Sequence, residues 1–513
     1  MTTETHPTTF RAWLRKHYEV ILVGAILLAA LALRLYNLEA SSFWIDELTQ
    51  IRRSRLSFFA MLKDVVREVS AVPIEYTITH FVYYYIGRSE GILRLPAVLW
   101  GVSSVAAVYY LGRRMFDRTT GLLAAALLAF MPIQVYYSQE MRPYILASMM
   151  VLLTTLAFHR ALTLNTRGAW ALYGGTLVVG MYAHYYVAVV GILHGAYLVW
   201  MALAKRLPWR SLRPYLVAAG IAGLLFAPWV AADIYDMIVR KGVFLNEGRN
   251  FQLPALAALL RSPFVAQGAN YALTADRPLT WFIAVAWVLA AAGVALAFAR
   301  KRDWWSSLGL AAIVGFGGMA AVLALDSTAA YYFATRQMVP FGPPIVLLVC
   351  AAWVGLFRAA WSRLARRPAN WATGALAAIL LLAFSVGTLA GPLSGVYAYR
   401  KHDWRGASRY LLQNVQRDDI VVTRIPYYPE IYVPELADQI IALTNAGTIT
   451  SQAKTHTRVW ILERPDAMRN SMPDVQAWVD SEKPLEIKGF TGLRLYLYSE
   501  SLSPQELKDS VRR

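Results

Sequence analysis

Two neighbouring acids, Asp46 and Glu47, are the residues of this chain whose type and spacing most directly indicate chemistry. They stand in the segment Ser42-Phe43-Trp44-Ile45-Asp46-Glu47, shortly after a long apolar run that ends near Leu38. Adjacent carboxylates are hard to keep ionised together in a low-dielectric cleft, so we expect them to take part in a reaction or to be bathed by water. The structural alternative is a helix N-terminal cap, which the helix dipole favours for acids.

Arginines at the ends of apolar runs are candidates for binding a leaving group that develops negative charge, such as a phosphate. Arg142 is the first of them, because it lies in a Gln139-Glu140-Met141-Arg142 turn between two apolar runs, where a charge is costly unless it is paired or solvated. Arg336 is the second. The alternatives are an ion pair between Arg142 and Glu140, and snorkelling of Arg336 to the membrane surface.

Aromatic residues and a histidine complete the candidate substrate-binding group. His184 stands between Tyr182 and Tyr185 and can bind a sugar or share a proton, although a lone histidine in an aromatic cluster is more often structural. Tyr137 can stack on a sugar, as can the residues Trp44, Tyr136, Tyr331 and Tyr332. Trp and Tyr are also common at membrane interfaces, which is the alternative explanation.

The composition places these residues in a membrane protein. The chain has 513 residues, of which 57% are hydrophobic and only 16% are charged, which is too apolar for a soluble domain of this length. Its net charge of +18 comes from short basic clusters between apolar runs, a pattern typical of cytoplasmic loops and not of nucleic-acid binding. The single cysteine, Cys350, excludes an internal disulfide bond and a site with several thiolate ligands.

About eleven apolar runs are long enough to be membrane-spanning helices. The first follows Arg11, Arg15 and Lys16, and its length favours an uncleaved span with a cytoplasmic N-terminus over a signal peptide. The runs are Val20–Leu38, Ile92–Leu111, Gly121–Tyr137, Tyr144–Leu162, Trp170–Ala183, Val187–Leu203, Leu216–Ala232, Leu279–Phe298, Leu308–Leu325, Val339–Phe357 and Trp371–Leu389.

A shorter segment, Pro73–Ile86, decides which side of the membrane each later loop faces. If this segment crosses the membrane, the later basic clusters fall outside; if it does not, they fall in the cytoplasm. We therefore predict an interfacial or re-entrant helix inside one long outer loop, residues 39–91. In the same loop, Ile51–Glu68 mixes apolar and basic residues as amphipathic surface helices do. Arg52 and Arg53 in that segment are weaker candidates for substrate binding, because contact with anionic lipids explains them almost as well.

The last part of the chain reads as a separate soluble domain. We expect residues 1–392 to form the transmembrane domain and residues 393–513 to form an extracytoplasmic α/β domain. Predicted strands are Ile420–Thr423, Arg458–Leu462 and Leu493–Tyr498, and predicted helices are Arg405–Gln416 and Ala467–Asp480.

Motifs spread over nearly the whole chain resemble those of the GT-C glycosyltransferases, in particular the protein O-mannosyltransferases and the lipid A aminoarabinose transferases. The motifs are Arg34-Leu35-Tyr36-Asn37-Leu38, the Ser42–Glu47 segment, Gly87-Arg88-Ser89-Glu90, Leu93-Arg94-Leu95-Pro96, Tyr137–Tyr144, Tyr182-Ala183-His184-Tyr185, Ala227-Pro228-Trp229, Arg336–Pro340 and Asp403–Ala407. One feature departs from the family. Many relatives have His-Pro-Pro or Lys-Pro-Pro where this chain has Ala71-Val72-Pro73, so the role of that basic residue must pass to another group or be absent.

The resemblance implies a GT-C fold and transfer of a sugar from a polyprenyl-phosphate carrier to an acceptor hydroxyl. The acceptor can be a lipid, a glycan or a protein, and the reaction is expected to be inverting and to occur on the outer face of the inner membrane. By the same resemblance Asp46 is the general base, with Glu47 beside it, and no metal cofactor is implied. No metal motif appears in the sequence, although two carboxylates can hold a divalent cation through oxygen ligands.

Two other functions fit parts of the sequence. A transporter or flippase for lipid-linked sugars would use ionisable groups near the middle of the membrane, but here they gather at the outer ends of the runs and no internal repeat is evident. A GT-C scaffold without activity would explain the missing His/Lys-Pro-Pro. The enzyme hypothesis requires the acids and the arginines to lie in one cavity at the non-cytoplasmic end of the helices.

Overall fold

A computed structural model describes residues 10–67, 71–240, 277–299, 304–329, 335–365 and 371–499. The chain forms two compact units. The first, which we call the helical unit, comprises Met1–Tyr36, Phe58–Phe81 and Leu93–Tyr397. The second, which we call the sheet unit, comprises Asn37–Ser57, Val82–Ile92 and Ala398–Arg513. Two segments of the predicted outer loop, including the one with Asp46 and Glu47, therefore fold together with the C-terminal part of the chain.

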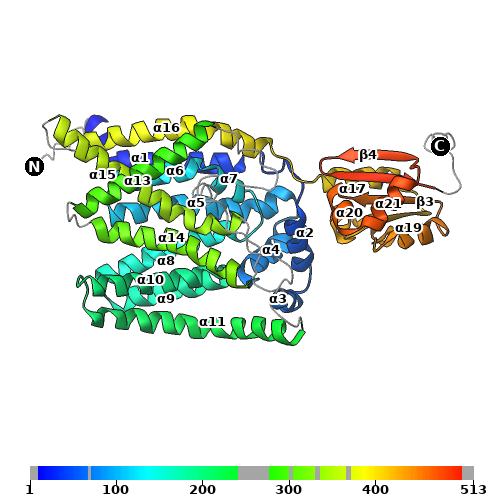
Figure 1. Cartoon of the computed structure of the whole chain (residues 1–513), viewed down its shortest axis with the longest axis horizontal. Coiled ribbons are helices and arrows are strands. Elements are labelled where there is room, and N and C mark those ends of the chain that lie inside the picture. The colour runs from blue at the N-terminus through cyan, green and yellow to red at the C-terminus, as the bar shows by residue number, and fades with distance from the viewer. Residues whose placement is uncertain are drawn as a thin grey trace, which may run out of the picture. The chain divides into compact units, whose positions relative to one another are not determined.

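The helical unit consists of long helices that run side by side (Figure 1). Each of the eleven predicted apolar runs lies mainly in helical structure. The helices wholly or mainly in this unit are α1 (Phe10–Leu35), α3 (Phe58–Val66), α4 (Pro73–Tyr85), α5 (Glu90–Met115), α6 (Arg118–Phe130), α7 (Pro132–Tyr137), α8 (Tyr144–Leu164), α9 (Arg167–Ala183), α10 (Tyr186–Leu203), α11 (Leu212–Arg240), α13 (Arg277–Ala299), α14 (Trp304–Ala329), α15 (Gly342–Leu364) and α16 (Trp371–Ala398), with 3-10 helices η1 (Trp209–Ser211) and η3 (Thr335–Phe341).

Within the described residues, eight helices are long and apolar enough to cross a membrane: those that contain α1, α5, α8, α10, α11, α14, α15 and α16. The chain is therefore a multi-pass membrane protein, as its composition predicts. The other three runs lie in α6 with α7, in α9 and in α13, and the number eleven stays a prediction. The segment predicted to be interfacial forms α4, whose 13 residues are too few to span a bilayer.

The run Gly121–Tyr137 is two helices and not one continuous helix. α6 ends at Phe130, Met131 is extended (φ −68°, ψ 119°), and α7 begins with Pro132. A proline has no backbone N–H and disfavours helical conformation in the residue before it, so the break lies where the sequence places Pro132. This break leaves the last carbonyl groups of α6 in need of hydrogen-bond donors.

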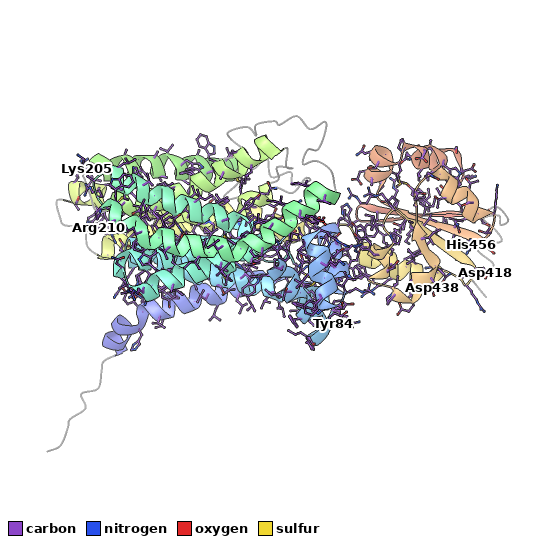
Figure 2. The ribbon with its side chains drawn as sticks, turned by 90° about the horizontal axis from the view of Figure 1, so that it is seen from below. Tyr84, Lys205, Arg210, Asp418, Asp438 and His456 are labelled. Atoms are coloured by element: carbon purple, nitrogen blue, oxygen red, sulfur yellow. The ribbon has the colours of Figure 1, made fainter. Side chains whose placement is uncertain are left out.

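The basic clusters gather at one end of the helical unit. Arg113 and Arg118 lie 2.8 Å and 3.2 Å from Glu19 in the first half of α1. Lys205 and Arg210, between α10 and α11, lie at the end from which α1 starts (Figure 2). The turn between α9 and α10, with His184, is at the other end of α10. This distribution is the one that cytoplasmic clustering of positive charge produces.

One fully buried guanidinium group, that of Arg34 on α1, joins three helix ends. It donates to the backbone oxygen of Ala129 (3.1 Å) near the end of α6 and to Ser138 Oγ (3.0 Å) just after α7. In the opposite direction, the amide nitrogen of Gln139 donates to the backbone oxygens of Arg34 (3.0 Å) and Tyr36 (2.7 Å) at the end of α1. The Arg34 side chain thus caps the end of α6, and the Gln139 side chain caps the end of α1. These hydrogen bonds fix where the Gln139–Arg142 turn begins.

The sheet unit contains a five-stranded mixed sheet in the order β2-β1-β3-β5-β4 (Figure 1). β1 is parallel to β2 and β3, and β5 is antiparallel to β3 and β4. The strands are β1 (Asp419–Thr423), β2 (Ile440–Ala442), β3 (Arg458–Glu463), β4 (Glu486–Phe490) and β5 (Leu493–Tyr498), and the helices are α2 (Ile45–Ser54), α17 (Trp404–Asn414), α18 (Tyr427–Glu430), η4 (Pro434–Gln439), α19 (Ala446–Ala453), α20 (Pro465–Ser471) and α21 (Pro473–Ser481).

The sequence predicts the centre of this sheet well and its edges poorly. β1, β3 and β5 correspond to the three predicted strands, and the predicted α/β character is confirmed. β2 and β4 are missing from the prediction, because β2 has only three residues and β4 is largely exposed. The predicted helix Ala467–Asp480 is two helices, since Pro473 begins α21. In the core, the buried Asp419 carboxylate accepts from Arg458 Nη2 (2.6 Å) and Trp460 Nε1 (3.0 Å) on β3.

Gly101 on α5 tests the importance of the Arg34 contacts. A Cβ atom at this position would lie 2.1 Å from Ser138 Oγ and 2.6 Å from Arg34 Nε. We expect Gly101→Ala to force these groups apart and to lower the free energy of unfolding by about 1–3 kcal/mol, as overpacking does. Gly175→Ala on α9 is the matched control, because no atom lies within 4 Å of its added Cβ. Thermal unfolding of both purified variants measures the difference, and an equal melting temperature for the two variants would contradict the expectation.

Candidate active site

The acid pair lies in the first turn of α2, and the two side chains have different surroundings. Glu47 is fully buried, and its Oε2 accepts from the backbone N–H of Trp44 (3.2 Å). The same oxygen lies 3.5 Å from Lys401 Nζ, in the segment between α16 and α17. The helix start is therefore capped by Glu47 and not by Asp46, so the two neighbouring acids do not share this role.

Asp46 is half-buried on α2, which packs against α18 within the sheet unit. Tyr428 on α18 is buried, and its pKa is raised first by burial, then by its neighbour Tyr427, and further by the negative charge of Asp46. Thr49 Oγ1 lies 3.2 Å from Tyr427 Oη. The Tyr428 phenol therefore keeps its proton beside the Asp46 carboxylate.

The two predicted cations on α2 have different environments. The guanidinium carbon of Arg52 lies 5.2 Å from the centre of the Tyr427 ring, and the Arg52 side chain is exposed. Arg53 is buried. Arg52 is therefore held by a cation–π contact with α18, while its charge remains accessible to solvent.

Hydrogen bonds tie the loop before α2 to the start of α17. Ser42 Oγ donates to Asp403 Oδ1 (2.9 Å), and the same carboxylate oxygen accepts from the N–H of Gly406 (2.8 Å) as the N-cap of α17. The backbone N–H of Phe43 donates to Tyr432 Oη (2.7 Å). The motif around Asp403 thus has a defined task in the sheet unit, which is to hold the segment that leads into Asp46.

Glu90 and Arg405 connect the other loop segment to this network. Arg405 Nη1 lies 3.2 Å from Glu90 Oε2, and Arg405 Nη2 donates to the backbone oxygen of Glu39 (3.1 Å). The Glu39 carboxylate accepts in turn from Ser89 Oγ (2.9 Å) and from the N–H of Gly91 (3.1 Å). The ion pair between Glu90 and Arg405 therefore joins the motif around Glu90 to the motif around Asp403.

In the helical unit, one buried aromatic ring collects four of the predicted substrate-binding side chains. The Tyr144 ring centre lies 6.0 Å from the guanidinium carbon of Arg142 and 5.9 Å from that of Arg336. It also lies 6.1 Å from the His184 ring centre and 5.5 Å from that of Tyr137. We call Arg142, Arg336, His184, Tyr137 and Tyr144 the Tyr144 cluster. Two guanidinium groups around one ring, beside a histidine that burial keeps neutral, form a place suited to an anion.

Hydrogen bonds to residues earlier in the chain hold the backbone near both arginines. The backbone N–H of Arg142 donates to the oxygen of Glu140 (2.8 Å) in the turn that the Gln139 hydrogen bonds hold in place. Glu140 itself is buried. For Arg336, the amide of Gln134 on α7 donates to the backbone oxygen of Val339 in η3 (3.4 Å). α7 therefore connects both sides of the Tyr144 cluster.

Aromatic packing fixes the His184 side of the cluster. The His184 ring centre lies 4.5 Å from that of Tyr186, which lies 5.9 Å from Phe341 at the end of η3. Phe341 occupies space that only a glycine at position 318 on α14 leaves open, since a Cβ there would lie 2.0 Å from the ring. Burial, and secondly the positive charge of Arg142, lower the pKa of His184 to about 4. His184 is therefore neutral at pH 7.

The segment Ala71-Val72-Pro73 is held by α11. Trp229 Nε1 donates to the backbone oxygen of Ala71 (3.2 Å), just before α4. On the same helix, Asp233 Oδ2 accepts from Tyr185 Oη (2.9 Å), beside His184. Burial, and secondly the Asp233 charge, raise the pKa of Tyr185. No basic side chain stands at Ala71, Val72 or Pro73. The polar contact of this segment with α11 is made by the backbone oxygen of Ala71, which accepts from Trp229.

The predicted site residues thus fall into two groups. Asp46, Glu47, Arg52 and Arg53 belong to the sheet unit, and Arg142, Glu140, Arg336, His184 and Tyr137 belong to the helical unit. That the two groups act in one cavity stays a prediction. Tyr331 and Tyr332 lie outside the described residues.

Two central residues were missed as site candidates from the sequence. Tyr144 looks like one of many interface tyrosines, and its nearness to Arg336, almost 200 positions later, leaves no local pattern. The contact of Lys401 with Glu47 is likewise long-range. Tyr144 does follow the Arg142-Pro143 motif directly, and that adjacency is the one signal that could have indicated it.

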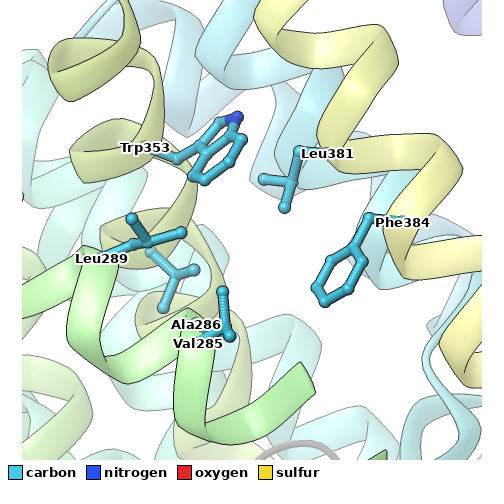
Figure 3. A pocket seen from close by; sticks show the side chains of 7 residues that line it. Val285, Ala286, Leu289, Trp353, Leu381 and Phe384 are labelled. Atoms are coloured by element: carbon cyan, nitrogen blue, oxygen red, sulfur yellow. The ribbon is translucent and has the colours of Figure 1, made fainter. Parts of the chain in front are cut away.

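A separate pocket between α13, α15 and α16 carries no chemistry of this kind. It is lined by the apolar side chains Val285, Ala286, Leu289, Val349, Trp353, Leu381 and Phe384 (Figure 3). The Trp353 N–H donates to the backbone oxygen of Ala377 (3.0 Å). Over the described parts of the chain, no three His, Cys, Asp or Glu side chains gather as metal ligands would.

Comparison with known proteins supports the resemblance seen in the motifs. The family model for dolichyl-phosphate-mannose-protein mannosyltransferase matches residues 72–231. A search of curated proteins finds no match to the sequence.

The whole fold is similar to those of two solved membrane proteins. The first is ArnT from Cupriavidus metallidurans bound to undecaprenyl phosphate, with a TM-score of 0.61 and 13% identity over 95% of this chain and 99% of that one. The second is the Archaeoglobus fulgidus oligosaccharyltransferase AglB, solved with an inhibitory peptide and a dolichol-phosphate. Its TM-score is 0.57, with 12% identity over 96% of this chain and 75% of that one. The predicted GT-C fold, a helical membrane part followed by a small sheet domain, is confirmed.

Proposed function

We propose that this protein is a membrane glycosyltransferase that moves a sugar from a polyprenyl-phosphate-linked donor to an acceptor hydroxyl. The Tyr144 cluster carries this proposal, because two guanidinium groups lie 6.0 Å and 5.9 Å from the centre of one tyrosine ring, in a chain whose fold matches ArnT over almost the full length of both. ArnT was solved with undecaprenyl phosphate, and AglB with a dolichol-phosphate. A lipid phosphate is the chemical feature that both ligands share.

Arg142 and Arg336 bind the donor phosphate in this proposal. The phosphate gains negative charge as its bond to the sugar breaks, and guanidinium groups stabilise that charge through paired, charge-assisted hydrogen bonds. The neutral ring of His184 can donate or accept a hydrogen bond without adding a further positive charge. Tyr137 supplies an apolar wall, and the buried Glu140 belongs to the turn that positions Arg142.

Asp46 is the general base. It takes the proton of the acceptor hydroxyl while that oxygen attacks the anomeric carbon of the sugar. The bond from that carbon to the phosphate oxygen breaks, and its electrons leave with the polyprenyl phosphate. A single displacement of this kind inverts the anomeric configuration. Glu47 caps α2 and so positions Asp46, while Arg52 and Arg53 on the same helix are candidates for contact with an anionic acceptor or donor.

In this proposal the reaction occurs on the extracytoplasmic face of the inner membrane. The basic clusters Arg113/Arg118 and Lys205/Arg210 mark one end of the helical unit as cytoplasmic by the positive-inside rule. The turn with His184 lies at the opposite end of α10. The Tyr144 cluster is therefore assigned to the outer end.

Replacing Asp46 by asparagine tests the proposed reaction most simply. Mass spectrometry of envelope lipids and glycans, from cells with and without the gene, first identifies the glycosylated product. We expect Asp46→Asn to lower its formation by about 10²–10⁴-fold, the usual contribution of a general base. Asp438→Asn, at an exposed acid of the sheet unit (Figure 2), is the matched control and should leave product formation unchanged. Full product with Asp46→Asn would remove the residue from this role.

The role of the arginines predicts a loss of lipid-phosphate affinity. Arg142→Gln and Arg336→Gln should each weaken binding of undecaprenyl phosphate by roughly 10- to 100-fold, because a hydrogen bond to a charged group contributes about 1.5–3 kcal/mol. Lys205→Gln and Arg210→Gln, at exposed cations at the other end of the unit (Figure 2), are the controls. Titration of the purified variants with undecaprenyl phosphate provides the affinities. Equal affinity in all four variants would contradict the assignment.

The low pKa of His184 predicts how stability depends on pH. Below pH 6.5 the unfolded chain gains a proton on this histidine, whereas the folded protein gains it only near pH 4. Stability is thus lost as the pH falls through this window, by about 1–3 kcal/mol. His184→Phe keeps an aromatic ring and should lose less stability between pH 7 and pH 4.5, as melting temperatures of both proteins would show. Identical losses would mean that His184 titrates normally.

A further inference from the structure

We propose that Lys401 is a positioning residue for the sugar transfer: it holds Glu47 as a buried ion pair and so keeps in place the turn of α2 that presents Asp46 to the acceptor hydroxyl. This inference rests on the proposed function and adds a residue that the sequence motifs do not indicate. It also explains how two neighbouring carboxylates are tolerated at one helix start.

The geometry around Lys401 lies wholly within the sheet unit. Its Nζ is 3.5 Å from Glu47 Oε2 and 5.6 Å from the centre of the Trp44 ring. The exposed fraction is 8% for the lysine side chain and 0% for that of Glu47. The ammonium group therefore contacts a buried carboxylate and an indole face, and both attract a positive charge.

The ion pair compensates the charge of the buried carboxylate. Breaking a buried pair by removing one partner is strongly destabilising, because the remaining charge is left uncompensated. Without the lysine, the Glu47 carboxylate would lose this charged partner and shift toward solvent. This shift would disturb its hydrogen bond to the N–H of Trp44, which caps the turn that carries Asp46.

The neighbouring charges explain why Asp46 benefits. Among the described residues, the groups around this turn include Lys401 from the linker before α17, Tyr427 and Tyr428 from α18, and Arg52 from α2. A second uncompensated carboxylate in this turn would repel the negative charge of Asp46. The positive charge of Lys401 offsets the charge of Glu47 and so reduces this repulsion.

A direct role in binding the donor phosphate is the competing explanation for a buried lysine near the acids. The two roles predict different activities for a variant in which both Glu47 and Lys401 are replaced by neutral residues. If Lys401 only positions Glu47, removing both charges together should restore the geometry. If Lys401 binds phosphate, the double replacement should remain as defective as the single one.

Four variants separate these cases: Lys401→Met, Lys401→Arg, Glu47→Gln, and the double variant Glu47→Gln with Lys401→Met. Three quantities are measured at matched protein amounts: formation of the product identified by mass spectrometry, affinity for undecaprenyl phosphate, and melting temperature. We expect Lys401→Met to lower product formation between about tenfold and 100-fold, the scale of a misplaced reacting group. Its undecaprenyl phosphate affinity should stay unchanged, Lys401→Arg should retain activity, and the double variant should regain most of what Lys401→Met loses.

Several outcomes would overturn the proposal. Undiminished product with Lys401→Met would do so, as would weakened undecaprenyl phosphate binding in that variant or a folded double variant that is no more active than the single one. If the wild-type protein forms no glycosylated product at all, the proposed sugar transfer fails and the role of Lys401 in it fails too. The melting temperatures tell this case apart, because they still measure whether Glu47 and Lys401 are energetically coupled.

Discussion

The buried guanidinium group of Arg34 is the contact on which the arrangement of the helical unit depends. A charge inside apolar helices is tolerated only where hydrogen-bond acceptors surround it, and the break before Pro132 supplies them by leaving the end of α6 uncapped. Ser138 supplies a further acceptor, and Gly101 leaves the space for this contact. Sequence-local features of three different helices therefore meet in one set of hydrogen bonds.

The residues next to this contact also position the candidate site. Gln139, just after α7, caps α1 and begins the turn that ends in Arg142, while Gln134 on α7 holds the 3-10 helix that contains Arg336. Both arginines are thus positioned by α7 and the residues directly after it, and Tyr144 lies near each of them. A site that must stabilise charge as it develops gains from such rigid supports, because its groups need no rearrangement during the reaction.

Much of the fold and most of the candidate site residues could be predicted from the sequence. The contacts that could not be predicted were missed for physical reasons. Apolar runs reveal helices, and the Arg142, His184 and Arg336 motifs mark helix ends, so the helical membrane fold and most candidate residues follow from the pattern. The break at Met131 was missed because the apolar run continues through it, although Pro132 signals it. The pairing of Glu47 with Lys401, and the gathering around Tyr144, join residues far apart in the chain, which no local pattern records.

The most direct test is an experimental structure of the protein in a lipid bilayer with undecaprenyl phosphate bound. We predict that the phosphate group is hydrogen-bonded by the guanidinium groups of both Arg142 and Arg336, beside the Tyr144 ring. A phosphate group bound elsewhere, with neither arginine in contact with it, would contradict the proposed role of this cluster and with it the proposed reaction.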